Sequence, residues 1–91
     1  MNIISHFVNG KKFLGDSKRT SKIFNPATGE QSAEVKLASA KDMGKAVEDA
    51  KNAFFSWSKK PPLQRARVMF KFKEILEKNF EELTKIIVSE H

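Results

Sequence analysis

A tight turn is encoded by the segment Phe24-Asn25-Pro26-Ala27-Thr28-Gly29-Glu30. The ring of Pro26 fixes φ near the value that the second position of a turn requires, and it removes a backbone donor. Gly29 can adopt the positive φ that a tight reversal often needs. After the turn, apolar residues alternate with polar ones, at Ala33, Val35 and Leu37. The sequence therefore predicts a β-hairpin that is entered through Ile23-Phe24 and has one buried face.

A second hairpin signal lies closer to the amino terminus. The dipeptide Asn9-Gly10 suits the two positive φ values of a type I′ turn. It is flanked by His6-Phe7-Val8 and by Lys11-Lys12-Phe13-Leu14, which supply the two strands. The segment 15–20 is polar and has no apolar period, which predicts a connecting loop. Residues 1–38 are therefore expected to form two hairpins.

The period of the apolar residues changes from two to between three and four after Leu37, which predicts a helix. Its apolar face is formed by Met43, Val47, Ala50, Phe54 and Trp57. Ser39 can accept a hydrogen bond from the first turn of this helix, and Asp42 interacts favourably with the helix dipole there. Pro61-Pro62 ends the helix, and Pro62 is suited to the first position of a second one.

Two further apolar stripes predict two more helices. The second helix has an inner stripe at Leu63, Ala66, Met69, Phe72 and Leu76, and additional apolar residues at Val68, Phe70 and Ile75. Asn79 and Glu82 repeat the start signal for a third helix that runs to His91. Its stripe is Phe80, Leu83 and Ile87, with Ile86 and Val88 beside it. The predicted fold is therefore α/β, or α+β within this segment, with hairpins over residues 1–38 and helices over residues 39–91.

The composition is that of a small globular unit. The chain has 91 residues, of which 40% are hydrophobic and 31% charged, and no apolar run approaches a membrane span of about 20 residues. The amino terminus shows no secretory signal pattern, so we expect a soluble, cytoplasmic protein without a membrane partner. The chain contains no cysteine, which excludes disulfides and thiol catalysis within these residues.

The net charge of +6 raises the alternative of a small basic module that binds nucleic acid. Its best candidate residues are Arg65, Arg67, Lys71 and Lys78, interleaved with Phe70 and Phe72. The helical spacing of Phe54, Trp57, Phe72 and Phe80 instead favours core positions for the aromatic side chains. We therefore expect no specific nucleic-acid partner.

The chemistry-bearing residues do not form a recognisable site. His6 and His91 lie at opposite ends of the chain and have no cysteines beside them. Glu81 and Glu82 are neighbours in a predicted helix and point about 100° apart. Gly10 and Gly15 have the spacing of P-loop glycines, but Asp16-Ser17 follows where lysine and a hydroxyl are required, and no G-x-G-x-x-G is present. We assign no catalytic, cofactor-binding or metal-ligating residue.

Several segments together resemble the amino-terminal part of NAD-dependent aldehyde dehydrogenases. They are the turn at residues 24–30, Ala53-Phe54-Phe55-Ser56-Trp57, Pro62-Leu63-Gln64-Arg65-Ala66-Arg67 and Ser89-Glu90-His91. Within that family, residues 65–72 and 89–91 are most similar to the methylmalonate-semialdehyde dehydrogenases. The resemblance implies that residues 1–91 are the opening part of the NAD-binding domain and that the catalytic domain is absent from them. It also implies that the family pattern continues after His91 with a Gly-Lys pair, so we expect a fragment.

The resemblance carries further expectations about the parent enzyme. That enzyme would oxidise a small semialdehyde through a cysteine thiolate, pass hydride to NAD and the acyl group to coenzyme A, and assemble as a homotetramer. Some members bind a structural monovalent cation partly through backbone carbonyls, which here would be those of Ile23 and Phe24. The 91 residues alone would be an inactive scaffold whose partner is the remainder of the subunit. A truncated subunit that docks on a full-length dehydrogenase remains an alternative.

Overall fold

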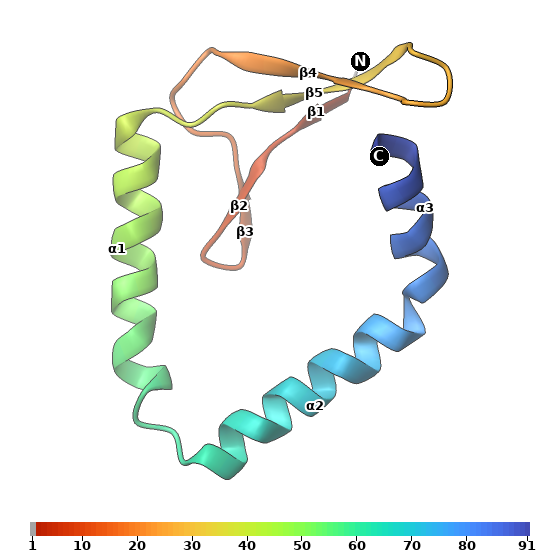
Figure 1. Ribbon diagram of the computed structural model, residues 1–91. Coiled ribbons are helices and arrows are strands. Elements are labelled where there is room, and N and C mark those ends of the chain that lie inside the picture. The colour runs from red at the N-terminus through yellow and green to blue at the C-terminus, as the bar shows by residue number, and fades with distance from the viewer. Residues whose placement is uncertain (1) are drawn as a thin grey trace.

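The computed structural model describes residues 2–91, and it contains the two predicted hairpins followed by the three predicted helices (Figure 1). The first hairpin pairs β2 (His6–Val8) with β3 (Lys11–Phe13), and the second pairs β4 (Thr20–Phe24) with β5 (Gln31–Lys36). Asn9 and Gly10 have φ values of 54° and 73°, which confirms the turn with two positive φ values. The mixed α/β character is confirmed.

One strand was not predicted. β1 (Asn2–Ile4) pairs in parallel with β5, and the sheet has the order β1-β5-β4. Asn2 lies opposite Ala33, and Ile4 lies opposite Val35. A strand of three residues is too short to show a period, and its pairing with a segment about thirty residues away leaves no local signal.

The turn between β4 and β5 is held by Asn25 as well as by the two predicted residues. The Gly29 N–H donates to the Asn25 carbonyl at 2.8 Å, and the Ala27 N–H donates to Asn25 Oδ1 at 2.9 Å. Gly29 has a φ of 75°, as the turn requires. The side chain of Asn25 therefore supports the bend that Pro26 and Gly29 make accessible.

The first helix begins as predicted, and the side chains of both Ser39 and Asp42 form hydrogen bonds at its start. Ser39 caps α1 (Ala40–Trp57): its Oγ accepts from the Asp42 N–H at 3.0 Å, while Asp42 Oδ2 accepts from the Ser39 N–H at 3.0 Å. This reciprocal pair is a capping box, here with aspartate at the third helical position. The second helix, α2 (Pro62–Lys78), starts at Pro62 as expected.

The predicted start of the third helix is confirmed at Asn79, but the expected side-chain cap is not formed. Asn79 stands between α2 and α3 (Phe80–Glu90), but its side chain makes no cap hydrogen bond to α3. Instead its Nδ2 donates backwards to the Ile75 carbonyl at 2.8 Å. Asn79, at φ −108° and ψ 18°, joins α2 to α3, and its side-chain amide bonds to the end of α2.

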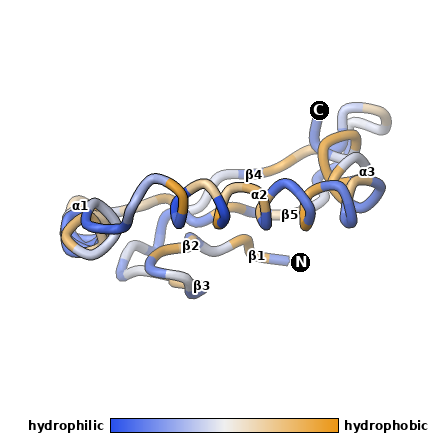
Figure 2. Tube along the Cα trace, turned by 90° about the horizontal axis from the view of Figure 1, so that it is seen from below, coloured by the Kyte–Doolittle hydropathy of each residue, from blue (hydrophilic) through white to orange (hydrophobic). Residues whose placement is uncertain are grey.

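The helices and the sheet form an open frame instead of a packed globule (Figure 1). α1 descends from one end of the sheet, α2 crosses below, and α3 returns towards the other end. Seen from below, these elements lie in one thin layer (Figure 2), and the principal extents are 48 × 35 × 15 Å. The radius of gyration is 16.9 Å, whereas a compact chain of this length has about 12 Å.

The predicted apolar core is therefore wrong for this chain on its own. Among the described residues, Ala33 is the only buried hydrophobic one. The aromatic side chains predicted to be internal are between 39% and 68% exposed, namely Phe54, Trp57, Phe72 and Phe80. In the hairpin predicted to bury one face, Val35 and Leu37 are only half-buried. The periodic patterns predicted apolar faces on the helices, but the large side chains on those faces stay exposed within residues 2–91.

Candidate functional site

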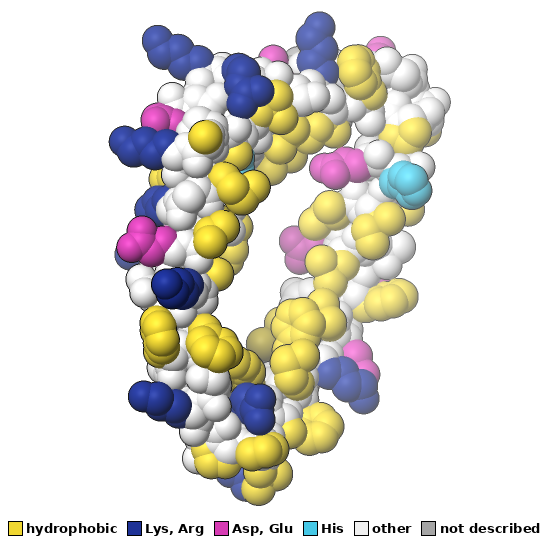
Figure 3. Space-filling model, turned by 60° about the vertical axis from the view of Figure 1, so that its left-hand side comes forward, with side chains coloured by type: hydrophobic (Ala, Val, Ile, Leu, Met, Phe, Trp, Pro, Cys, Tyr) yellow, Lys and Arg dark blue, Asp and Glu magenta, His cyan; other side chains and the backbone are white. Residues whose placement is uncertain are grey.

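The most extensive candidate site is the apolar surface of the three helices. Apolar side chains gather along the inner edge of the frame and also on its outer side (Figure 3). The additional apolar residues beside the predicted inner stripes are exposed by 48% to 68%: Val68, Phe70, Ile75, Ile86 and Val88. Together with the predicted inner stripes of α1, α2 and α3, these side chains form what we call the docking surface.

The size of the exposed surface shows how much is left uncovered. The accessible area is 7808 Å² for a mass of 10.3 kDa, whereas a compact monomer of that mass exposes about 5,400 Å². The excess of about 2,400 Å² is roughly three times what each partner buries in a standard protein interface. A small ligand cannot cover such an area, so only a partner of the size of a protein domain can cover the docking surface.

A compact polar cluster lies where the sheet joins α1. We call it the clasp and define it as Asp16, Ser39 and Asp42. Asp42 Oδ1 accepts from the Asp16 N–H at 3.2 Å, and Ser39 Oγ donates to Asp16 Oδ1 at 2.6 Å. Asp42 is 5% exposed and is the only buried polar residue among those described. Gly15, with φ 75°, packs against it, and a Cβ there would lie 2.6 Å from Asp42 Cγ.

The electrostatics of the clasp favour an ionised Asp42. The hydrogen bond from the Ser39 N–H is the largest influence lowering the pKa of Asp42 below its ordinary value, opposed by the loss of solvent around the carboxylate. The Asp16 N–H, the Ser39 hydroxyl and the nearby His6 also lower the pKa of Asp42. A carboxylate held in this way stabilises a helix start.

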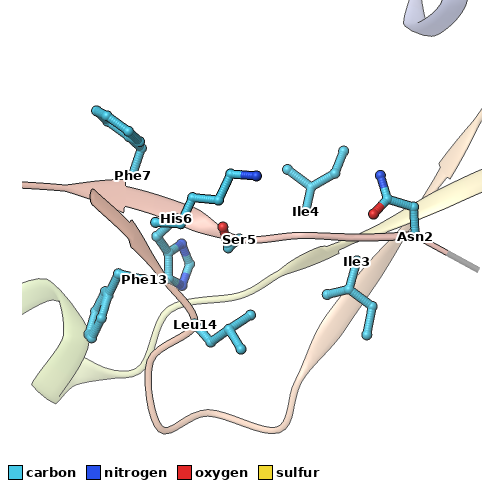
Figure 4. A pocket seen from close by; sticks show the side chains of 9 residues that line it. Asn2, Ile3, Ile4, Ser5, His6, Phe7, Phe13 and Leu14 are labelled. Carbon is cyan, nitrogen blue, oxygen red and sulfur yellow. The ribbon is translucent and has the colours of Figure 1, made fainter. Parts of the chain in front are cut away.

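A cavity of about 600 Å³ lies beside the first hairpin. Its lining comes from β1, β2 and the end of β3 (Figure 4) and includes Ile3, Ile4, His6, Phe13 and Leu14. His6 Nε2 is buried and has no hydrogen-bond partner among the described residues. The lining is mostly apolar, and its ionisable side chains are those of His6 and Lys12.

The candidate residues from the sequence are not brought together. His6 lies on β2 and His91 follows α3, and no cluster of histidine, aspartate or glutamate suited to a metal occurs within residues 2–91. On α2, Arg67, Lys71 and Lys78 share one side, but Arg65 lies about 200° around the helix from Arg67. Lys71 also pairs with Glu74 at 3.5 Å. The predicted basic face is therefore incomplete.

The carbonyls considered for a monovalent cation sit at the end of β4. Ile23 pairs with Ala33 across the hairpin, and Phe24 pairs with Gln31 across an irregular step in the register. The Ile23 carbonyl accepts a hydrogen bond from Ser32 Oγ at 3.3 Å. These contacts neither assemble a ligand set nor test the cation expectation. No helix in the described part of the chain is long and apolar enough to cross a membrane.

Known proteins share the sequence and the backbone geometry of this chain. Malonate-semialdehyde dehydrogenases of Pseudomonas aeruginosa and Halalkalibacterium halodurans are each 40% identical to this chain, over 100% and 97% of it. The structure of a proposed methylmalonate-semialdehyde dehydrogenase from Sinorhizobium meliloti, complexed with NAD, superposes with a TM-score of 0.97 at 46% identity. The methylmalonate-semialdehyde dehydrogenase of Oceanimonas doudoroffii gives 0.95 at 44% identity. Both structures are matched over 100% of this chain.

The chain spans 18% of the length of each of these four proteins. The open frame therefore has the conformation that the corresponding segment adopts inside much longer chains. A sequence model of the aldehyde dehydrogenase family matches residues 13–91, which include the second hairpin and all three helices. By sequence and by fold, the chain belongs to the aldehyde dehydrogenase family.

Proposed function

We propose that residues 1–91 are the amino-terminal scaffold of an NAD-dependent aldehyde dehydrogenase that acts on methylmalonate or malonate semialdehyde. The observation that carries this proposal is the match over the whole chain to dehydrogenases named for those substrates, of which it spans 18%. The docking surface supports the scaffold role, because the remainder of such a subunit is large enough to cover about 2,400 Å² of excess surface.

The proposal places the chemistry outside these residues. The chain has no cysteine for aldehyde attack, and the cavity beside the first hairpin is lined mainly by apolar side chains. NAD does not fit the described residues, because they contain no glycine-rich phosphate loop. In this proposal the reactive thiol, NAD and coenzyme A as acyl acceptor belong to the remainder of the subunit. A homotetrameric, cytoplasmic parent enzyme completes the proposal.

A chimera tests the scaffold role directly. The segment of the Pseudomonas aeruginosa malonate-semialdehyde dehydrogenase that aligns with this chain is replaced by residues 1–91, at 40% identity. We expect the chimera to be soluble and to reduce NAD with malonate semialdehyde. The same relative without the segment is the control, and we expect it to be insoluble or inactive. A soluble, correctly assembled chimera without activity would contradict the scaffold role.

Residues 1–91 alone supply the complementary test. We expect no NAD reduction with methylmalonate semialdehyde, malonate semialdehyde or propanal, with or without coenzyme A, and no rise in melting temperature at millimolar NAD. Turnover that survives removal of host dehydrogenases would show that the chain carries chemistry of its own. If the genomic reading frame continues past His91, the substrate proposal is tested on the full product with the same aldehydes.

A further inference from the structure

We propose that the clasp is a conformational device that fixes the direction of α1 relative to the sheet. In this view the docking surface of α1 is oriented by polar contacts inside the segment, before anything covers it. The inference concerns the shape of the chain and does not rest on the proposed enzymatic function.

The first argument is that the clasp ties together parts that are distant in sequence. Asp16 belongs to the loop between β3 and β4, whereas Ser39 and Asp42 form the start of α1. The bond from the Asp16 N–H to Asp42 Oδ1 spans 26 residues, and the bond from Ser39 Oγ to Asp16 Oδ1 spans 23. Two hydrogen bonds between the same loop and the same helix start restrict rotation of one relative to the other.

The second argument is that the same loop is also fastened to the strand that leads into α1. The Leu37 N–H donates to the Arg19 carbonyl at 3.0 Å, and Arg19 Nη2 donates to the Ala38 carbonyl at 2.8 Å. Lys36 Nζ donates to the Ser17 carbonyl. The loop is thus bonded to the end of β5, to the connection after it and to the first turn of α1.

The third argument is that apolar packing does not perform this task. Ala33 is the only buried hydrophobic residue within residues 2–91, and it lies in the sheet, away from the clasp. On the same helix as Asp42, Met43 and Val47 are 59% and 60% exposed. The most buried side chain at the junction of the sheet and α1 is Asp42 itself. The orientation of α1 therefore depends on polar contacts.

The absence of cysteine makes the orientation directly measurable. Ser21 on β4 and Ser56 on α1 are both exposed, so Ser21→Cys and Ser56→Cys together accept one nitroxide label each. Pulsed electron paramagnetic resonance then gives the distribution of distances between the sheet and α1. We expect one narrow distribution in the labelled chain and at least a twofold broader one after Asp42→Ala.

Asp49→Ala is the matched control. Asp49 lies on the same helix and pairs with Lys45 at 2.6 Å, so the same substitution removes an ion pair outside the clasp. It leaves in the chain Lys45 itself, whose Nζ lies 5.2 Å from the centre of the Phe13 ring. We expect Asp49→Ala to leave the distribution unchanged. If Asp42→Ala loses its helical circular dichroism, Ser39→Ala decides, because it removes the bonds of Ser39 Oγ to Asp16 and to the Asp42 N–H but retains the Asp42 carboxylate and its bond from the Asp16 N–H. A broad distribution in the parent chain, or a narrow one in every helical clasp variant, would overturn the proposal.

Discussion

Gly15 offers the sharpest test of the junction between sheet and helix, because a matched glycine exists elsewhere in the chain. Gly15 and Gly29 both have φ 75°, so an alanine at either position suffers the same backbone penalty. That penalty is about 1–2 kcal/mol for a residue with a side chain in the left-handed region. The two sites differ in their surroundings: a Cβ at Gly29 meets nothing within 4 Å, whereas at Gly15 it meets the Asp42 carboxylate.

The structure therefore predicts a larger effect for Gly15→Ala than for Gly29→Ala. The added methyl group displaces the Asp42 side chain, which breaks the reciprocal bonds with Ser39 and weakens the start of α1. Loss of an N-cap costs about 0.5–2 kcal/mol. Gly29→Ala is expected to cost about 1–2 kcal/mol, and Gly15→Ala about 1.5–4 kcal/mol.

Urea titration followed by circular dichroism at 222 nm compares the free energy of unfolding of both variants with that of the parent chain. Trimethylamine N-oxide is added so that each chain is fully folded at the start of the titration. Hydrogen exchange locates the change: the amides of Asp16, Ser39 and Asp42 should lose protection in Gly15→Ala and keep it in Gly29→Ala. Equal destabilisation by the two substitutions, with protection retained at the start of α1, would refute the contact between Gly15 and Asp42.

Three further outcomes are expected. Because its hydrogen bonds lower the pKa of Asp42 below the ordinary 3.8, the stability that this group contributes is present above about pH 4. This stability is lost as the pH falls through the lower folded-state pKa. The helical circular dichroism should therefore fall with acid in the parent chain and depend less on pH in Asp42→Asn. Phe70→Ser, at a side chain 68% exposed, should change the stability of the isolated chain by less than about 0.5 kcal/mol and reduce dye binding and self-association in sedimentation. Unchanged self-association would show that Phe70 on α2 is not part of the surface through which the chain associates with itself. DNA should bind only at low salt, and tight binding at physiological salt would favour the nucleic-acid module.

Local signals predicted the secondary structure well, because each was set by a few adjacent residues. Asn9-Gly10 and Pro26 with Gly29 fixed the two hairpin turns, and Pro62 fixed the start of α2. The hydrogen bond of the Asn79 side chain was not predicted, because this side chain had two possible partners. Asn79 had the composition of a helix start, but its amide bonds to the carbonyl of Ile75 behind it, a choice that depends on the backbone angle between the helices.

The sequence predicted only part of the clasp. Ser39 and Asp42 were predicted to start α1 because they are three residues apart, which is a local spacing. The sequence predicts only a loop around Asp16, since nothing near it indicates a bond to a helix residue 26 positions away. A glycine followed by an aspartate in a loop before a strand was the available signal, and it becomes informative only once the close packing of Gly15 on Asp42 is known.

The apolar stripes correctly predicted which faces of the helices are apolar, but the pattern cannot tell whether the covering partner lies inside or outside the chain. This distinction explains why polar contacts organise the junction. A segment that presents its apolar faces to a larger body cannot also use them to hold itself together, because each side chain is buried only once. Hydrogen bonds at the base of α1 fix a direction without consuming that surface. Such bonds are individually worth only about 0.5–1.5 kcal/mol, and α2 and α3 have no equivalent connection to the sheet among the described contacts. We therefore expect α1 to keep its orientation in isolation, while the positions of α2 and α3 depend on the body that covers them.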